Sequence, residues 1–197
     1  MKLRITTRPV ALFLLTVFLR LPLHGTMQAV DTPDNGNVSE GTFTSRFFGF
    51  SYKIPQGLTP QRNSGFKKHV DNLSGPRVST FILLVAATLV KPYKNVVIKA
   101  ERVVGLQNGA SYLQKVSSSA MKNGLSVLGS PEQKILAGNK TFFRQDYYSP
   151  QGEFFQTQVC TLSKGYALDF VISAKTREDI DQLFDSLNAI EFVAERE

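Results

Sequence analysis

Residues 140–173 read KTFFRQDYYSPQGEFFQTQVCTLSKGYALDFVIS, and they carry the clearest strand pattern in the chain. Apolar and polar residues alternate through most of it, which is typical of β-strands that turn one face to a core. Two short runs containing Ser, Gly or Pro interrupt the alternation and predict tight turns. We therefore expect strands at 140–148, 153–162 and 166–173, with turns at 149–152 and 163–165. Strands joined by turns this short must be antiparallel neighbours, so the stretch predicts a three-stranded meander.

A strongly amphipathic helix is predicted directly after the meander, at about 176–188. Its apolar residues recur at helical spacing, at Ile180, Leu183, Phe184 and Leu187. Thr176 and Asp179 form a capping pair at its start, and acidic residues in the first turn favour the positive end of the helix dipole. Residues 190–192 (IEF) then predict a short closing strand.

Upstream of the meander the same reasoning predicts further strands. One strand carries Phe48, Phe50, Tyr52 and Ile54 on a single face and ends at Pro55 and Gly57. The apolar run 78–90 and the alternating run 96–104 form a hairpin around the turn 91–95.

A second helix is predicted at about 107–122, where apolar residues return at helical spacing. Asn108 caps its start, and Asn123 with Gly124 ends it in the left-handed conformation. Residues 125–137 return to a β pattern that Ser130 and Pro131 interrupt. Together these segments predict an α+β domain.

Residues 1–29 have the layout of a secretory signal peptide. Lys2, Arg4 and Arg8 precede the ten-residue apolar run 10–19 (VALFLLTVFL). A membrane span needs about 20 apolar residues, and Arg20 stops this run halfway. We therefore expect cleavage near Ala29, export to the periplasm or the cell exterior, and no stable membrane span after processing.

The mature chain is expected to hold one soluble domain between two polar segments. Residues 30–42 are small, polar and turn-forming, so they predict a flexible leader. Residues 43–192 are long enough for one domain with a sizeable core, and residues 193–197 form a polar tail.

Charge and residue types exclude several function classes. The signal holds four of the 23 Lys+Arg and none of the 16 Asp+Glu, which leaves 19 bases against 16 acids, too small an excess for a nucleic-acid binder. Cys160 lies in an alternating strand and is interpreted as a small buried hydrophobe. The only histidine after the signal is His69, so neither a catalytic triad nor a zinc site is predicted. We expect no catalytic, metal-binding or cofactor-binding residues and no cofactor.

One charge asymmetry suggests an interaction surface. Residues 60–104 carry eight Lys+Arg against two acids, whereas residues 176–197 carry seven acids against two Arg. A basic patch formed by the first segment would attract an acidic partner or anionic lipid. The predicted patch consists of Arg62, Lys67, Lys68, Arg77 and Lys91. The alternative is ordinary solvated charge scattered over the surface.

Aromatic residues gather on the predicted meander, where they invite a second interpretation as a ligand pocket. They are Phe142, Phe143, Tyr147, Tyr148, Phe154 and Phe155. Aromatic residues at this density on paired strands are more often core and cross-strand packing.

The order of these segments resembles that of the PsbP-like superfamily over about residues 43–192. The resemblance is carried by residues 48–57 (FGFSYKIPQG), 95–101 (NVVIKAE), 111–113 (SYL), 135–140 (ILAGNK) and 187–192 (LNAIEF). It implies a single antiparallel β-sheet with helices packed on its faces, an α/β/α sandwich of the α+β class. It also implies an accessory role, and it carries no catalytic motif that transfers to particular residues.

The sequence therefore leaves two functions open. The first is an exported, non-enzymatic interaction or accessory module that binds an unknown protein or envelope component. The second is a small-ligand or metal-assisted binding protein with a pocket between sheet and helix. A cavity lined by convergent polar groups would favour the second function, and an exposed apolar or charged patch would favour the first.

Overall fold

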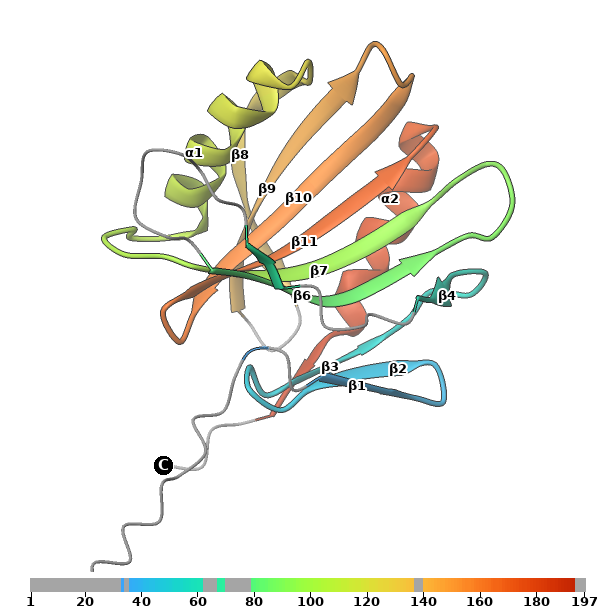
Figure 1. Cartoon of the computed structure of the whole chain (residues 1–197), viewed down its shortest axis with the longest axis vertical. Helices are drawn as coiled ribbons and strands as arrows, with labels where there is room; N and C mark the ends of the chain where they lie inside the picture. Colours follow the sequence, from blue (N-terminus) through green and yellow to red (C-terminus); the bar gives the residue numbers. More distant parts are fainter. Residues whose placement is uncertain (1–32, 34–35, 62–66, 70–78, 137–139, 194–197) are drawn as a thin grey trace, which may run out of the picture. The chain divides into compact units, whose positions relative to one another are not determined.

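The computed structural model describes residues 33, 36–61, 67–69, 79–136 and 140–193. The strands in this part of the chain form two sheets in which every pairing is antiparallel (Figure 1). The larger sheet has the order β4 (Thr59–Pro60), β6 (Ser79–Ala87), β7 (Asn95–Arg102), β11 (Tyr166–Ala174), β10 (Phe154–Ser163), β9 (Lys140–Ser149) and β8 (Ser126–Leu136), with β5 (Lys67–His69) also paired to β6. The smaller sheet has the order β1 (Gly36–Ser39), β2 (Thr42–Ser45), β3 (Phe50–Lys53) and β12 (Glu191–Phe192).

The meander β9–β10–β11 and the hairpin β6–β7 are confirmed, but the prediction of a single sheet is wrong. One edge of β3 pairs with β2 and the other pairs with β12, so β3 has no free edge for the larger sheet. β3 instead packs its apolar face against the larger sheet, where the Phe50 and Phe170 ring centroids lie 5.8 Å apart. The two sheets therefore share one aromatic core.

Order begins earlier than the sequence predicts. Residues 30–42 were expected to form a flexible leader, yet β1 starts at Gly36 and pairs with β2. Most side chains of β1 are exposed, so main-chain hydrogen bonds hold it in place. Glu40 and Gly41, with φ of 49° and 72°, make the tight turn between the two strands. The predicted signal peptide at 1–29 and the tail after Val193 lie outside the described residues.

Two α-helices begin at the predicted capping residues. In α1 (Gly109–Lys122), the Asn108 side chain accepts a hydrogen bond from the Ser111 backbone N–H at 3.1 Å. In α2 (Arg177–Asp185), Thr176 Oγ1 accepts from the Asp179 backbone N–H at 3.1 Å. A 3₁₀ turn, η2 (Ser186–Ala189), continues α2 towards β12. Among the described residues, no helix combines the length and the apolar character that crossing a membrane requires.

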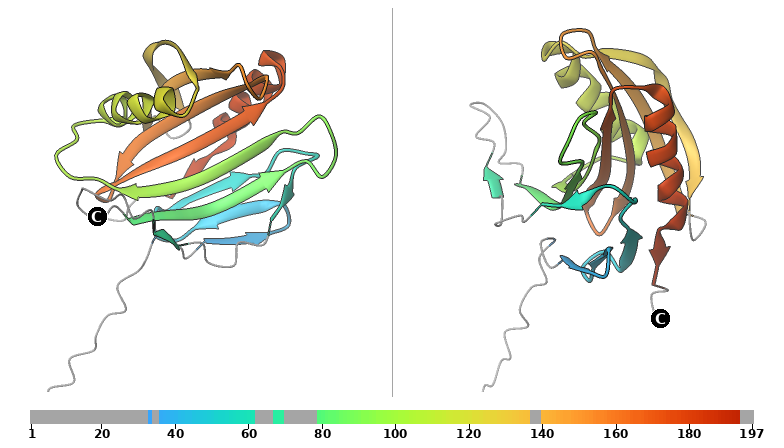
Figure 2. Two further views of the ribbon diagram at one scale, coloured as in Figure 1. Left: turned by 45° about the horizontal axis from the view of Figure 1, so that its top comes forward. Right: turned by 90° about the vertical axis from the view of Figure 1, so that its right-hand side faces the viewer.

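The helices lie on opposite faces of the larger sheet (Figure 2, right). α1 packs on β8, β9 and β10, whereas α2 packs on β10 and β11. The alternation of β10 explains this division: Cys160 faces the α1 side with Tyr112, and its neighbour Val159 faces the α2 side with Ile180. The larger sheet with its two helices therefore forms the predicted sandwich.

Candidate functional site

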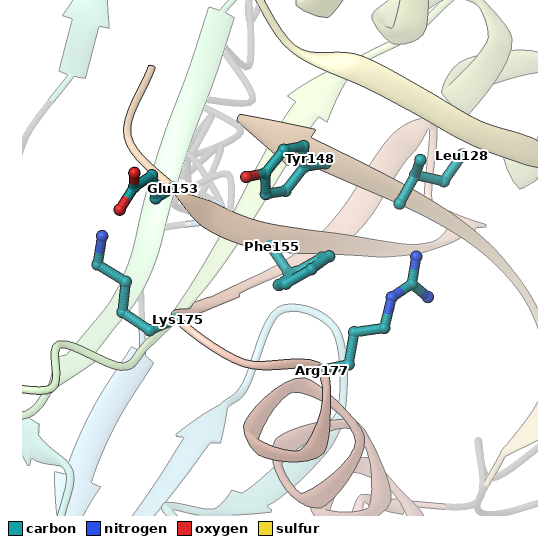
Figure 3. Close-up of a pocket in the computed structure, with 6 residues that line it drawn as sticks. All are labelled: Leu128, Tyr148, Glu153, Phe155, Lys175 and Arg177. Atoms are coloured by element: carbon teal, nitrogen blue, oxygen red, sulfur yellow. The ribbon is translucent and has the colours of Figure 1, made fainter. Parts of the chain in front are cut away.

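An open groove lies at the rim of the larger sheet, where β8, β9 and β10 meet the start of α2 (Figure 3). It has a volume of about 640 Å³ and is wide open to solvent. Its lining residues are Leu128, Tyr148, Glu153, Phe155, Lys175 and Arg177. We refer to these six residues as the rim groove.

Strand register places two aromatic rings side by side in the rim groove. Tyr148 on β9 is paired with Phe155 on β10, and their ring centroids lie 5.0 Å apart. The turn between these strands brings Glu153 to the rim in the left-handed conformation, with φ of 49°. Gly152 is needed in this turn because a Cβ there would lie only 2.6 Å from the Phe154 ring.

Two exposed cations flank the aromatic pair. The Arg177 guanidinium carbon lies 5.0 Å from the centre of the Phe155 ring, a cation–π contact. Lys175 Nζ donates a hydrogen bond to the Gly152 carbonyl at 2.6 Å. In Figure 3 Lys175 stands beside Glu153 at one end of the groove, and Arg177 stands towards Leu128 at the other. The groove thus offers flat apolar surface with Arg177 at one end and Lys175 beside the oppositely charged Glu153 at the other, so its lining has a net positive charge.

A hydrogen-bonded ion network fixes the sheet to α2 beneath the groove. Arg144 Nε lies 2.9 Å from Asp146 Oδ1, and Arg144 Nη2 lies 3.1 Å from Asp181 Oδ1 on α2. Thr157 Oγ1 donates to the same Asp146 oxygen at 2.6 Å. Although burial disfavours its charge, the two carboxylates raise the pKa of Arg144. The floor of the groove is therefore joined to α2 by charged hydrogen bonds, and the cavity within it, of about 10 Å³, is at the lower limit for one water molecule.

A second polar cluster is buried on the α1 face of the sheet. Asp169 is 0% exposed, and Lys99 Nζ lies 3.2 Å from its Oδ2 atom. Neither carboxylate oxygen accepts a hydrogen bond of good geometry from any described residue. Burial raises the pKa of Asp169, and the Lys99 ammonium only partly opposes this effect. Nearby, Tyr112 Oη donates to Glu101 at 3.1 Å.

Cys160 lies within this cluster and is fully buried beside Tyr112 and Leu113, as its interpretation as a small hydrophobe predicts. Burial, together with the neighbouring Asp169 carboxylate, raises the pKa of the thiol well above its ordinary value. The thiolate is the reactive form, so this environment makes Cys160 a poor nucleophile.

We expect Cys160 of the native chain not to react with an aromatic disulfide reagent, and to react once urea unfolds the chain. The physical reason is that both access and thiolate formation require unfolding. The absorbance of the released thiol measures the rate. Val104→Cys, at a position 90% exposed, is the matched control and should react at once. A native rate for Cys160 similar to that of the control would contradict the structural role.

The structure separates members of the predicted basic patch. The pairing of β5 with β6 puts Lys67 opposite Phe81 and Lys68 opposite Thr80, near the start of β6. Lys91 follows the other end of β6, roughly 20 Å away at the usual rise per strand residue. Arg62 and Arg77 lie outside the described residues. The patch as a whole stays a prediction.

Sequence reasoning missed Lys175, Arg177 and the Lys99–Asp169 pair. Lys99 and Glu101 alternate with apolar residues on β7, which indicated a polar face, but only the β7–β11 pairing shows that Asp169 lies opposite Lys99. Among the described residues, no three His, Cys, Asp or Glu side chains come together as a possible metal site.

Comparisons with known proteins identify the fold. No protein-family model matches the chain, and the search of curated proteins found no match. Among solved structures, the chain is similar to cyanobacterial PsbP (CyanoP) from Synechocystis sp. PCC 6803, with a TM-score of 0.51 and 12% sequence identity. The match covers 86% of this chain and 99% of that chain. At this identity the likeness shows the fold alone, and the chain has the PsbP-like fold that its sequence pattern predicts.

Proposed function

We propose that the chain is an exported, non-enzymatic accessory module that binds an acidic segment of a protein or envelope component in the rim groove. The observation that carries this proposal is the placement of Lys175 and Arg177 on either side of the Tyr148–Phe155 ring pair. Arg, Tyr and Trp are the side chains that most often dominate binding energy at protein interfaces. Positive charge at the rim attracts an acidic partner and orients it during encounter.

The shape of the groove favours an extended segment over a small molecule. Its volume falls within the range of about 300–1,000 Å³ that is usual for ligand pockets. Such pockets, however, enclose roughly 70–90% of a small ligand's surface. A groove this open leaves much of a small molecule in water, whereas an extended chain makes further contacts along the rim.

The five basic residues predicted from the sequence form a second element of this proposal. Lys67 and Lys68 at one end of β6, and Lys91 at the other, would contact different parts of an acidic partner. The accessory role is also the role that the resemblance to the PsbP-like superfamily implies.

We expect Arg177→Glu to reduce binding of the acidic partner about tenfold or more, because it reverses a charge and removes the contact with Phe155. The protein is immobilised and incubated with envelope extract of the source cell, and the captured partner is quantified as salt is raised. Wild-type capture should weaken with salt.

The matched control is Arg102→Glu, which reverses an exposed charge at the end of β7 far from the rim groove. It changes net charge by the same amount and should leave capture nearly unchanged. Equal losses in both variants would show that only net charge matters. Unchanged capture by a correctly folded Arg177→Glu chain would remove the groove from the proposal.

A further inference from the structure

The turn between β6 and β7 is an apolar projection at the rim of the sheet. We call residues 88–94 (TLVKPYK) the hairpin tip, which extends from the right-hand edge of the sheet in Figure 1. Leu89, Val90 and Tyr93 are 71%, 74% and 57% exposed. The other exposed large apolar residues of the described chain are scattered singly over separate elements, which is ordinary for a protein surface. Three exposed large apolar side chains within five residues, in contrast, need an explanation.

Hydrogen bonds within the hairpin tip and one ion pair to α2 hold the tip in place. The Thr88 backbone N–H donates to the Lys94 carbonyl at 2.9 Å, and the Lys94 backbone N–H donates to Thr88 Oγ1 at 3.0 Å. Thr88 Oγ1 in turn donates to the Pro92 carbonyl at 3.1 Å. Lys94 Nζ forms an ion pair with Asp179 of α2 at 2.5 Å. The exposed side chains are thus held outward, which reduces the entropy lost when they bind.

We propose that the hairpin tip inserts into the surface of an anionic lipid bilayer. The tip is convex, so its partner must be either a bilayer or a matching protein groove. Lys91 stands between Val90 and Tyr93 and makes no ion pair with the described residues. A protein groove that buried its neighbours would also take the Lys91 ammonium out of water, at a cost. At a bilayer surface the aliphatic stem lies beside the apolar side chains while the ammonium reaches lipid phosphates.

The residue types of the tip match a bilayer interface. Tyr is enriched at the level of lipid headgroups, where its ring is apolar and its hydroxyl remains hydrated. The tip contains no acidic residue, and since Lys94 is paired with Asp179, Lys91 is the tip lysine whose charge is available to an anionic surface, where a basic residue favours binding. This inference does not depend on the rim groove.

The chain contains no Trp, so Tyr93→Trp makes a single fluorescent reporter inside the tip. We expect its emission to shift to the blue when the full chain is mixed with vesicles of equal parts phosphatidylcholine and phosphatidylglycerol. Val104→Trp, at an exposed position outside the tip, should show no shift. This comparison reports insertion of the tip itself, whatever other part of the chain contacts the vesicle.

Adding Leu89→Ser and Val90→Ser to the Tyr93→Trp chain should weaken vesicle binding about tenfold or more, because two apolar side chains leave the interface. Adding Lys91→Glu instead should weaken it about fivefold or more, and only for anionic vesicles. All these positions are exposed, and far-UV circular dichroism checks that each chain is folded.

Three outcomes with vesicles alone would overturn the proposal. They are no shift for Tyr93→Trp with anionic vesicles, an equal shift for Val104→Trp, and an equal shift with phosphatidylcholine alone. A shift that appears only when envelope proteins are added would also overturn it, and would assign the tip to a protein groove.

Discussion

Replacing Lys99 with Met is expected to lower the free energy of unfolding by about 3 kcal/mol, because it leaves the Asp169 carboxylate buried without its cation. Losses of about 3–5 kcal/mol are usual when one partner of a buried ion pair is removed. The lower end applies here, since 20% of the Lys99 side chain stays exposed and water screens part of its charge. Urea denaturation followed by circular dichroism measures the difference.

The loss of stability caused by Lys99→Met should grow as the pH rises. Burial already raises the pKa of Asp169 above its ordinary value of 3.8, and removal of the Lys99 ammonium raises it further. A carboxyl group with a higher pKa in the folded chain binds its proton more tightly there than in the unfolded chain. The protonated Asp169 carboxyl therefore stabilises the folded chain at low pH. This stabilisation is lost as the pH rises through the pKa that Asp169 has in the folded chain. Lys99→Met should be less damaging in mildly acidic than in mildly alkaline buffer.

The control is the double variant Lys99→Met with Asp169→Leu, which removes both charges. Replacing a buried ion pair by apolar side chains of similar size is often neutral, so the double variant should recover most of the lost stability. A double variant less stable than Lys99→Met alone would show that Asp169 is stabilising in its own right. The pair would then not be the source of the effect.

Replacing Phe170 with Ala is expected to lower the free energy of unfolding by about 3–5 kcal/mol, because it opens a cavity where the two sheets meet. The Phe170 ring is fully buried, and its centroid lies 5.8 Å from that of Phe50, 6.2 Å from that of Tyr52 and 6.1 Å from that of Phe142. Phe50 and Tyr52 belong to the smaller sheet, whereas Phe142 belongs to the larger one. Thermal and urea unfolding of the variant measure the loss.

Val171→Ala is the matched control on the same strand. Val171 follows Phe170, faces the opposite side of the sheet and is only partly buried. Its truncation should cost about 1 kcal/mol or less. Similar losses in the two variants would contradict the idea that the aromatic contact between the sheets is a main source of stability.

The sequence predicts local structure well because each local signal has a local cause. The turns at 149–152 and 163–165 limit β9, β10 and β11 to antiparallel neighbours. The caps Asn108 and Thr176 each satisfy a backbone N–H within three residues, so the helix starts follow from the sequence. The prediction that was wrong, a single sheet, depends on pairing between residues far apart in the sequence. Nothing near Phe50 indicates that its strand pairs with Phe192 in a second sheet.

The candidate site was harder to predict, because it depends on contacts between distant elements. Tyr148 and Phe155 were interpreted as cross-strand packing, and they do pack against each other. What turns this pair into part of a groove is the return of the chain after β11, which brings Lys175 and Arg177 to the same rim. No local pattern around residue 175 contains that information.

The pairing of β12 with β3 also sets the order in which the molecule can be completed. While the chain is being synthesised, β3 appears early and must wait for more than a hundred residues before its partner exists. Until then Phe50 lies on a strand with one unpaired edge, the kind of surface that promotes aggregation. A chain clipped just before Glu191 keeps the segments of both helices and the meander, yet it leaves that edge open. The pairing of β12 therefore closes the second edge of β3, and a chain that lacks this two-residue strand leaves that edge open to contacts with other chains.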